Sequence, residues 1–383
     1  MGAGQLARML AEAASALGVW TIVLAERGDD AATGVACEVI LGSPTDASAI
    51  AALAGLCDVI TFDHELVDLD VLRGMQQGGA VVRPSPDTLE FAVDKSFQRA
   101  AFSAAGLPIP DHVVLGGSEA EDIRRLRAFA GGLGSPPVVK LARGGYDGRG
   151  VCVAGSLEEA ESASLAWRRG GSVVVAEAPV AMRRELAALV ARRPDGETVT
   201  WQVVETAQVN GVCREVLVPG SLDAATEAEA EALAHRVADV VGLAGVLAVE
   251  LFDTAEGLLI NEVAARPHNS GHWTIEGSVT SQFENHLRAV LDLPLGATDL
   301  AAPATATVNV FGSEPGDGRF DLAAALANAD AKVHLYGKVA RPGRKLGHVT
   351  VCGTDPATVR EDAWQAAVAL GTSRPEQTMG EPR

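Results

Sequence analysis

Apolar and polar positions follow two different patterns along the first part of the chain. Residues 5–17 and 49–56 carry apolar side chains at helical spacing and predict two amphipathic helices. Residues 20–26 and 57–65 are instead short, nearly continuous apolar runs that end in acidic side chains. Continuous apolar strands between helices are typical of a parallel sheet covered on both faces. We therefore expect an N-terminal parallel α/β domain over residues 1–92.

The pattern changes near residue 93, where we expect a second, longer domain over residues 93–298. A helix begins close to Asp87, which is the expected cap, and it carries Lys95 and Arg99 one turn apart. The segments that follow are predicted as a strand, glycine-rich loop and strand (137–154), a strand (172–178), antiparallel strands (183–219), a helix (225–241), a hairpin (246–264) and a helix (278–291).

The last part of the chain predicts a small β-rich domain over residues 299–373. Three alternating apolar segments, at 305–312, 331–337 and 348–353, predict strands, and a helical pattern follows them. The tail, residues 374–383, is polar and is expected to be disordered. The fold class expected for the whole chain is α/β, or α+β overall.

Composition narrows the classes of partner and the cellular compartment. The chain has 383 residues, 48% of them hydrophobic, and a formal net charge of −19, which argues against nucleic acid or an anionic membrane as a partner. Its five cysteines are widely spaced and include no Cys-x-x-Cys pair, a pattern typical of reduced thiols in the cytoplasm. We see neither a run of 18 apolar residues nor a secretory leader pattern.

The hairpin at 246–264 predicts a metal site. With its turn centred on Glu256, Glu250 and Glu262 lie directly opposite each other on one face, with Cβ atoms about 5 Å apart. Two opposed carboxylates repel, and Mg²⁺, which binds one or two carboxylates together with waters and phosphates, would compensate them. Asn261 adds a ligand only if the strand bulges. The alternative is a pair of exposed glutamates on an edge hairpin, which the apolar neighbours disfavour.

The glycine-rich loop at 140–150 predicts a phosphate site. Lys140 ends an apolar strand, so its ammonium group is held in a defined place, and glycine lets backbone N–H groups approach a ligand closely. A plain hairpin turn is the alternative. The glycines that we expect to contact phosphate, and the polar side chains of the same loop, are Gly144, Gly145, Gly148, Tyr146, Asp147 and Arg149.

Three other groups of polar residues are weak signals when each is taken alone. Glu177 ends an apolar strand and Glu185 follows it; each is more often a surface acid than a ligand for adenine or ribose. Residues 341–348 form a basic cluster that suits a phosphate monoester but also suits a solvated turn. Residues 2–6 open a helix and present backbone N–H groups, an arrangement that binds anions.

Residues 259–274 end a buried strand and then bring cationic and polar side chains close together. Arg266, His268 and Asn269 fall within four positions and predict a site for a small anion. The His268-x-x-x-His272 spacing also suits zinc, but no cysteine or other third ligand lies nearby in the sequence. We therefore favour the anion site.

Taken in order, Lys95, Lys140 with its glycine loop, and the two pairs of glutamates resemble the ATP-grasp enzymes. Within that superfamily, the segments GGYDGRG, INEVAARPHNSGHWT, SQFENHLRA and RPGRKLGH resemble the 5-(carboxyamino)imidazole ribonucleotide synthase family. The resemblance covers the chain up to its tail. It implies an ATP-grasp architecture with a biotin-carboxylase-like N-terminal domain, a lid over about 112–178, a core and a small C-terminal domain.

The resemblance also implies an activity and a set of partners. ATP would phosphorylate bicarbonate to carboxyphosphate. That intermediate, or CO₂ released from it, would carboxylate the exocyclic amine of aminoimidazole ribonucleotide during purine biosynthesis. Mg²⁺, or in its place Mn²⁺, would accompany ATP. The family implies a cytoplasmic homodimer that binds neither nucleic acid nor membrane and passes its product to a partner mutase.

The roles of individual residues follow from the same resemblance. The metal would be bound by Glu250 and Glu262. ATP would be bound by Lys95, Lys140, Gly144, Gly145, Gly148, Glu177, Glu185 and Asn261. The imidazole nucleotide would be bound by Gln5, Leu6, Glu65, Tyr146, Arg344 and Lys345. The catalytic side chains would be Asp147, Arg149, Arg266, His268, Asn269 and Lys338.

Two positions depart from the family pattern. The family's first strand ends in a Gly-x-Gly-Gln-Leu loop, so we expect a strand to be encoded ahead of Gly2. Asp63 stands where the family more often has Glu, while Glu65 keeps a second carboxylate.

Two rival functions stay open. They are another ATP-grasp ligase, such as the formate-using glycinamide ribonucleotide transformylase, and a non-catalytic nucleotide-binding protein.

Overall fold

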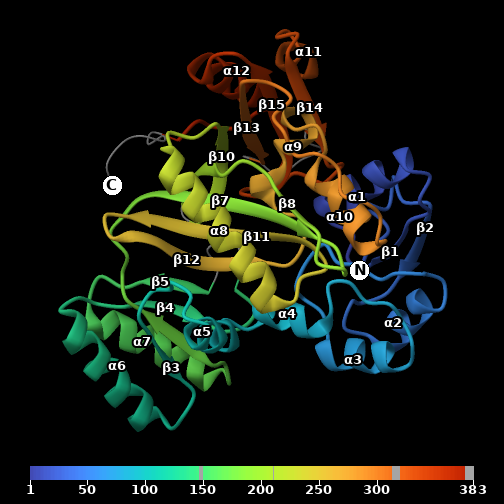
Figure 1. Cartoon of the computed structure of the whole chain (residues 1–383). Helices are drawn as coiled ribbons and strands as arrows, with labels where there is room; N and C mark the ends of the chain where they lie inside the picture. Colours follow the sequence, from blue (N-terminus) through green and yellow to red (C-terminus); the bar gives the residue numbers. More distant parts are fainter. Residues whose placement is uncertain (146–149, 210, 313–319, 376–383) are drawn as a thin grey trace.

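The computed structural model describes residues 1–145, 150–209, 211–312 and 320–375. A long, twisted sheet runs through the middle of the molecule (Figure 1). The last strands continue the sheet at the top of Figure 1, a small sheet with two helices lies below β12 at the opposite edge, and the N-terminal elements lie on the right. The predicted mixed α/β architecture is therefore confirmed.

The N-terminal part has parallel strand pairing, as its apolar runs predicted. Strands β1 and β2 pair in parallel, and Gly2 N–H donates to the Leu24 carbonyl 3.1 Å away, which joins the start of the chain to β1. The elements are α1 (Gln5–Ala16), β1 (Ile22–Ala25), β2 (Glu38–Leu41), α2 (Ala47–Ala54), α3 (Leu69–Gln77), α4 (Pro86–Val93) and α5 (Lys95–Ala104).

The strand predicted at 57–65 is wrong as a regular element. Only an isolated parallel bridge, between Ile60 and Val82, forms there. The segment is still extended and bonded on both sides, since Ile60 N–H donates to Val81 and Asp63 N–H donates to the Met1 carbonyl. Each neighbouring segment runs beside it for only a few residues, so no continuous ladder develops.

The single helix expected near Asp87 is two helices, and Asp87 does not cap either of them. The Ser85 side chain caps α4 by accepting from Thr88 N–H. The chain turns at Asp94, whose carboxylate caps α5 by accepting from the N–H groups of Ser96 and Phe97. This break puts Lys95 at the first turn of α5 rather than in mid-helix.

A four-stranded antiparallel sheet and two helices form the unit expected as the lid. Its strand order is β3-β6-β4-β5, and α6 and α7 pack on it (Figure 1). Strands β4 and β5 flank the glycine-rich loop, as predicted. The elements are β3 (His112–Leu115), α6 (Glu119–Leu133), β4 (Val138–Leu141), β5 (Val151–Val153), α7 (Leu157–Arg169) and β6 (Val174–Glu177).

The central sheet has nine strands, in the order β12-β11-β7-β9-β10-β13-β15-β14, with β8 paired to β7. Its first half is antiparallel, as expected, and α8 packs against β7 and β11. No helix in the described ranges is both long and apolar enough to span a membrane. The elements are β7 (Met182–Arg192), β8 (Thr198–Thr200), β9 (Val204–Val209), β10 (Val212–Val218), α8 (Ala224–Val241), β11 (Gly245–Thr254) and β12 (Gly257–Ala264).

The C-terminal strands belong to the same sheet, because β13 pairs with β10 from Glu215 to Val218. The side chains of β13 are buried along its whole length, and α12 packs on it and on β15. The remaining elements are the 3₁₀ turn η1 (Asn269–Gly271), α9 (Thr274–Gly277), α10 (Gln282–Val290), β13 (Ala304–Phe311), α11 (Leu322–Ala325), β14 (Ala331–Leu335), β15 (Lys345–Gly353) and α12 (Pro356–Ala369).

Candidate active site

A cavity of about 380 Å³ lies where the N-terminal domain, the glycine loop, the β11–β12 hairpin and β15 meet. Most of the predicted site residues that the structure describes line it, although they come from distant parts of the sequence. The lining includes Gln5, Leu6, Glu65, Lys95, Gly144, Gly145, Glu250, Glu262, Arg266, His268, Asn269 and Lys345.

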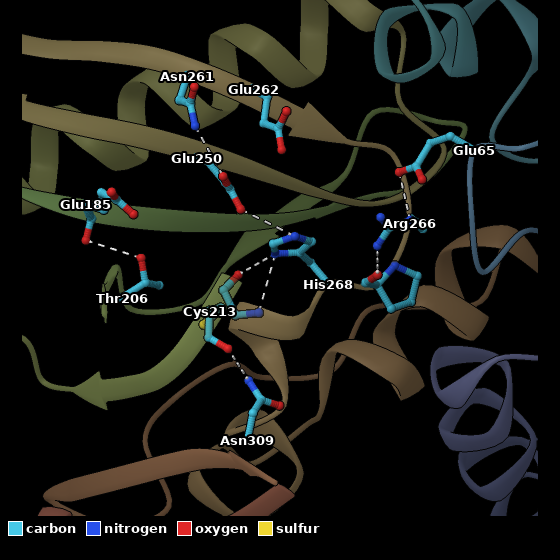
Figure 2. Close-up of polar contacts among 12 residues, drawn as sticks. Glu65, Glu185, Thr206, Cys213, Glu250, Asn261, Glu262, Arg266, His268 and Asn309 are labelled. Carbon is cyan, nitrogen blue, oxygen red and sulfur yellow. Dashed lines mark hydrogen bonds and ion pairs between the residues drawn. The ribbon is translucent and has the colours of Figure 1, made fainter. Parts of the chain in front are cut away.

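The predicted opposition of the two hairpin glutamates is confirmed. Glu250 and Glu262 are register partners, although the two-residue turn at Ala255–Glu256 alone would pair Glu250 with Asn261. A β-bulge makes up the difference: Leu251 pairs with Ile260, so Asn261 is the extra residue. The bulge also turns the Asn261 side chain toward Glu250, and the amide nitrogen lies 3.4 Å from Oε2 (Figure 2).

The pKa values of the two glutamates are shifted in opposite directions. Burial and the neighbouring Glu262 raise the pKa of Glu250, whereas the ammonium group of Lys95 lowers the pKa of Glu262. Lys95 forms an ion pair with Glu262 across the cavity. The hard oxygen donors of this pair suit Mg²⁺, which would relieve the repulsion that Glu250 experiences. No group of three acidic, histidine or cysteine side chains converges on a metal site within the described ranges.

A second ionic network joins three of the ATP-binding candidates. Lys140 Nζ is 2.7 Å from Glu177 Oε2, and it donates to Asn261 Oδ1 at 3.1 Å. Arg99 Nε is 2.7 Å from the other oxygen of Glu177, and its guanidinium also donates to the Asn261 carbonyl. Burial alone would raise the pKa of Glu177, but Lys140 and Arg99 outweigh it and lower that pKa to about 2. The Glu177 carboxylate therefore stays ionised and is held by two cations.

Arg99 is the residue of this network that the sequence analysis did not propose as a site residue. Its side chain is fully buried, yet its position one turn after Lys95 resembled an ordinary helix face. The available signal was an arginine among the apolar residues of α5, because a buried arginine is rare unless it is paired. A direct role of Glu177 toward adenine stays a prediction, as does that of Glu185, whose carbonyl accepts from Thr206 Oγ1 at 3.5 Å.

The glycines before α1 allow a carboxylate to approach the start of that helix. Gly4 N–H donates to Asp63 Oδ2 at 2.7 Å. A Cβ atom at Gly2 would lie only 1.7 Å from Asp63 Oδ1, and Gly2 has a φ of +91°, so glycine is required there. The shorter Asp63 thus fits against this loop. The neighbouring Glu65 lies 2.8 Å from Arg266 Nε (Figure 2).

The His268 side chain projects into the cavity and faces the metal-site candidates. Its Nε2 lies 3.5 Å from Glu250 Oε1, and its Nδ1 is 2.9 Å from Ser270 Oγ (Figure 2). Asn269 also lines the cavity. His272 is directed elsewhere: it is fully buried, and its ring stacks on His348 with centroids 4.7 Å apart. The two histidines do not share a site, so the rejection of zinc is supported.

Of the three basic candidates of the last domain, Lys345 lines the cavity, whereas Lys338 and Arg344 do not. Lys345 is buried and lines the cavity at the start of β15. Lys338 donates to the Gln5 side-chain oxygen of α1, which joins the C-terminal domain to the predicted phosphate loop. Burial, followed by the nearby Arg344, lowers the pKa of Lys338 to about 8. Arg344 donates to the Val339 carbonyl at 3.0 Å.

Four predicted site residues lie outside the described ranges. Tyr146, Asp147, Gly148 and Arg149 belong to the segment between β4 and β5. Their predicted roles toward the imidazole nucleotide and phosphate therefore stay predictions.

Family models match nearly the whole chain in three consecutive parts. A ribonucleotide synthetase preATP-grasp domain matches residues 1–93. An ATP-grasp domain matches residues 100–283, and a phosphoribosylaminoimidazole carboxylase C-terminal domain matches residues 305–362. The three matches follow the order of domains expected from the sequence.

Curated relatives and solved structures agree with these matches. N5-carboxyaminoimidazole ribonucleotide synthase of Mycobacterium tuberculosis is 45% identical, over 98% of this chain and 87% of the relative. The crystal structure of the synthetase from Thermus thermophilus superposes with a TM-score of 0.87 at 35% identity, covering 98% of this chain and 99% of the other. The Aspergillus clavatus synthase, in complex with ADP and the aminoimidazole ribonucleotide, also gives 0.87, at 30% identity and 97% coverage of both chains.

Proposed function

Because the chain belongs to the N5-carboxyaminoimidazole ribonucleotide synthase family, we propose that the cavity described above is where it carboxylates aminoimidazole ribonucleotide. The protein is an ATP-grasp ligase of purine biosynthesis. It uses ATP to attach a carboxyl group to the exocyclic amine of the nucleotide. The observation that carries our assignment is the meeting of Glu250, Glu262, Arg266 and His268 in one cavity with Gln5 and Lys345.

The ATP end of the site is formed by the hairpin, the lid strands and the glycine loop. Lys140 is held by Glu177 and Asn261, so its ammonium group is positioned before a phosphate arrives. Lys95 pairs with Glu262 and would exchange that partner for phosphate oxygens. Gly144 and Gly145 line the same cavity and leave their N–H groups close to its interior. These contacts support triphosphate binding between the lid and the central sheet.

Glu250 and Glu262 are the residues that would hold Mg²⁺. The ion, when bound, would supply charge neutralisation for the triphosphate and the transferred phosphoryl group. Mn²⁺, which also takes carboxylate ligands, would serve as a substitute.

Arg266, His268 and Asn269 are assigned to the reaction centre. A bicarbonate oxygen attacks the γ-phosphorus, the bond to ADP breaks, and carboxyphosphate forms. The amine nitrogen then attacks the carboxyl carbon, phosphate leaves, and the amine loses a proton. Arg266 carries a fixed positive charge beside this position, since Glu65 raises its pKa against the opposing effect of burial. Such preorganised donors stabilise the negative charge that develops on carboxyphosphate.

The nucleotide end of the site is formed by α1 and the C-terminal domain. Gln5 and Leu6 begin α1, and Lys345 faces them across the cavity. Lys338, bonded to Gln5, and Arg344 add positive charge at this wall, which suits a phosphate monoester. Tyr146, Asp147 and Arg149 are proposed, from the sequence alone, to contact the imidazole.

The remaining assignments rest on family membership and on composition. We propose that the protein is a cytoplasmic homodimer and that its product passes to a mutase that moves the carboxyl group. The reduced-thiol pattern supports this compartment, and the net charge of −19 argues against nucleic acid or an anionic membrane as a partner.

The test is an assay of ADP release and carbon fixation with radiolabelled bicarbonate. We expect ADP release to require bicarbonate and Mg²⁺, and to yield one fixed carbon per ADP when aminoimidazole ribonucleotide is present. ADP release that depends on formate and glycinamide ribonucleotide would indicate the rival transformylase. A folded protein that binds ATP without turning it over would indicate the non-catalytic rival.

A further inference from the structure

A buried amide holds the main chain of the segment that carries the reaction-centre side chains. Gln282 lies at the first turn of α10 and has no exposed surface. Its Oε1 accepts from His268 N–H at 2.9 Å, and its Nε2 donates to the His268 carbonyl at 2.7 Å. One side chain therefore satisfies both main-chain polar groups of His268.

The surroundings of Gln282 leave it little freedom to move. Its own N–H donates to Thr274 Oγ1 at 2.9 Å, and that hydroxyl donates to the Gly271 carbonyl at 2.7 Å. A Cβ atom at Gly271 would lie 2.5 Å from Gln282 Oε1, so the glycine lets the amide pack against η1. The amide, the hydroxyl and the glycine thus fix both ends of the short segment from His268 to Gly271.

We propose that Gln282 is a positioning residue for His268 in the carboxylation reaction. The inference rests on the proposed function, and it concerns the second half-reaction in particular. Both side-chain hydrogen bonds of Gln282 run to His268, whereas most ATP-side residues lie on the hairpin, the lid strands and the glycine loop. His268 lines the cavity together with Gln5 and Lys345, and its Nε2 lies 3.5 Å from Glu250 Oε1, so its placement affects how carboxyphosphate meets the amine.

Loss of the Gln282 amide would therefore uncouple the two half-reactions. Carboxyphosphate would still form, but a larger share would break down to carbon dioxide and phosphate before the amine attacks its carbon. Misplacement of a reacting group by about 1 Å costs on the order of 10²-fold in rate. The ratio of ADP released to carbon fixed reports this loss directly, and a purely structural defect would lower both quantities together.

The same helix supplies a matched control. Asn285 is also fully buried on α10, and it grips Gly296 in the same two-way manner. Gly296 N–H donates to Asn285 Oδ1 at 2.7 Å, and Asn285 Nδ2 donates to the Gly296 carbonyl at 3.1 Å. Gly296 lies in the connection to the C-terminal domain and does not line the cavity. Gln282→Met and Asn285→Leu thus remove equivalent clamps, only one of which is on the site.

The experiment measures ADP release, carbon fixation and Tm for the wild type and both variants. We expect similar falls in Tm, a ratio near one for the wild type and Asn285→Leu, and a ratio at least severalfold higher for Gln282→Met. If Gln282→Met does not fold, Gln282→Asn, which keeps the amide on a shorter side chain, is expected to raise the ratio in the same direction.

Two outcomes would count against different conclusions. A folded Gln282 variant whose ratio stays near one would overturn the positioning role, and so would an equal rise in Asn285→Leu. A wild-type protein that fixes no carbon at all would instead contradict the proposed function.

Discussion

At the scale of single residues, the site combines charges that neutralise one another before any ligand binds. Arg99 and Lys140 share the two oxygens of Glu177, and Lys95 pairs with Glu262. Removing one member of the buried Arg99–Glu177–Lys140 set leaves an uncompensated charge, which typically costs about 3–5 kcal/mol. These pairs explain why cationic side chains that are assigned to phosphate can be buried in the protein alone.

We predict that Glu262→Gln abolishes ATP turnover without unfolding the protein. An amide is a poor substitute for a carboxylate on Mg²⁺, and the change also frees Lys95 from its partner. ADP release is expected to fall by on the order of 10²-fold or more, as when a main electrostatic group is lost from an active site. The measurement is Mg²⁺-dependent ADP release, with circular dichroism to verify folding.

Glu256→Gln is the matched control for this change, because Glu256 is exposed in the turn of the same hairpin. It should turn over ATP at close to the wild-type rate. Near-normal ADP release by folded Glu262→Gln would rule out the metal assignment.

At the scale of elements, the bulge in the β11–β12 hairpin does two things at once. It restores the pairing of Glu250 with Glu262, and it makes Asn261 the extra residue, whose side chain and carbonyl hold Lys140 and Arg99. A regular hairpin would provide the paired carboxylates but not the contacts to the lid strands. The bulge therefore links the metal candidates to the phosphate candidates.

We predict that deletion of Asn261 leaves the hairpin intact but weakens ATP binding. Glu250 and Glu262 would still be opposed in a regular ladder, whereas Lys140 would lose one of its two side-chain acceptors and Arg99 its carbonyl acceptor. The KM for ATP should rise clearly, by about tenfold if the lost contacts amount to roughly 1.4 kcal/mol. Steady-state kinetics with varied ATP would measure it.

Asn261→Ala separates the two contributions, since it keeps the bulge and the carbonyl and removes only the side-chain contacts to Lys140 and Glu250. Its KM for ATP should lie between those of the wild type and the deletion. A deletion variant with an unchanged KM would show that the bulge has no role in ATP binding.

At the scale of the whole molecule, buried imidazoles join the domains. His348 on β15 stacks between His272 and His334, and its ring centroid lies 4.7 and 4.5 Å from theirs. Its Nδ1 forms a hydrogen bond of 2.7 Å with the Tyr336 hydroxyl. His286 on α10 reaches Thr61 of the N-terminal domain at 2.7 Å. The C-terminal sheet thus meets the segment after the hairpin through stacked rings, and α10 meets the N-terminal domain through His286.

These rings predict that acid destabilises the folded protein. Burial lowers the pKa of His272 and His348 well below the usual 6.5, and that of His286 to about 3. Below about pH 6.5 the unfolded chain binds protons that the folded protein does not, so the free energy of unfolding falls as the pH decreases. Each histidine contributes up to about 1.4 kcal/mol per pH unit. Urea unfolding at pH 7.5, 6 and 5 would measure the slope.

A variant isolates this effect from the titration of carboxylates. His348→Phe keeps a ring in the stack but removes one titrating group, so its stability should depend less steeply on pH than that of the wild type. Equal slopes for the two proteins, or a wild-type stability that does not change between pH 7.5 and 5, would contradict the prediction.

The sequence alone determined most of the elements and the opposition of the two hairpin glutamates, whereas the roles of the site residues stay predictions. The periodicity of apolar residues predicted most helices and strands, because the burial pattern within one element depends on residues that are close together in the sequence. The pairing of Glu250 with Glu262 and the roles of Lys140 and Arg266 depend on motifs in which a few neighbouring residues carry the chemistry. The failures were local too: Ser85 rather than Asp87 caps α4, and residues 57–65 form one bridge instead of a strand.

Only the tertiary structure decided which distant residues share a cavity and which hold the others in place. Arg99 and Gln282 belong to helices whose hydrophobic pattern looks ordinary, and their buried contacts are made with partners 78 and 14 positions away in the chain. The continuation of the central sheet through β13 is likewise a long-range pairing. A sequence pattern indicates whether a side chain is buried. It does not indicate which residues that side chain packs against, because the packing of the whole chain decides them.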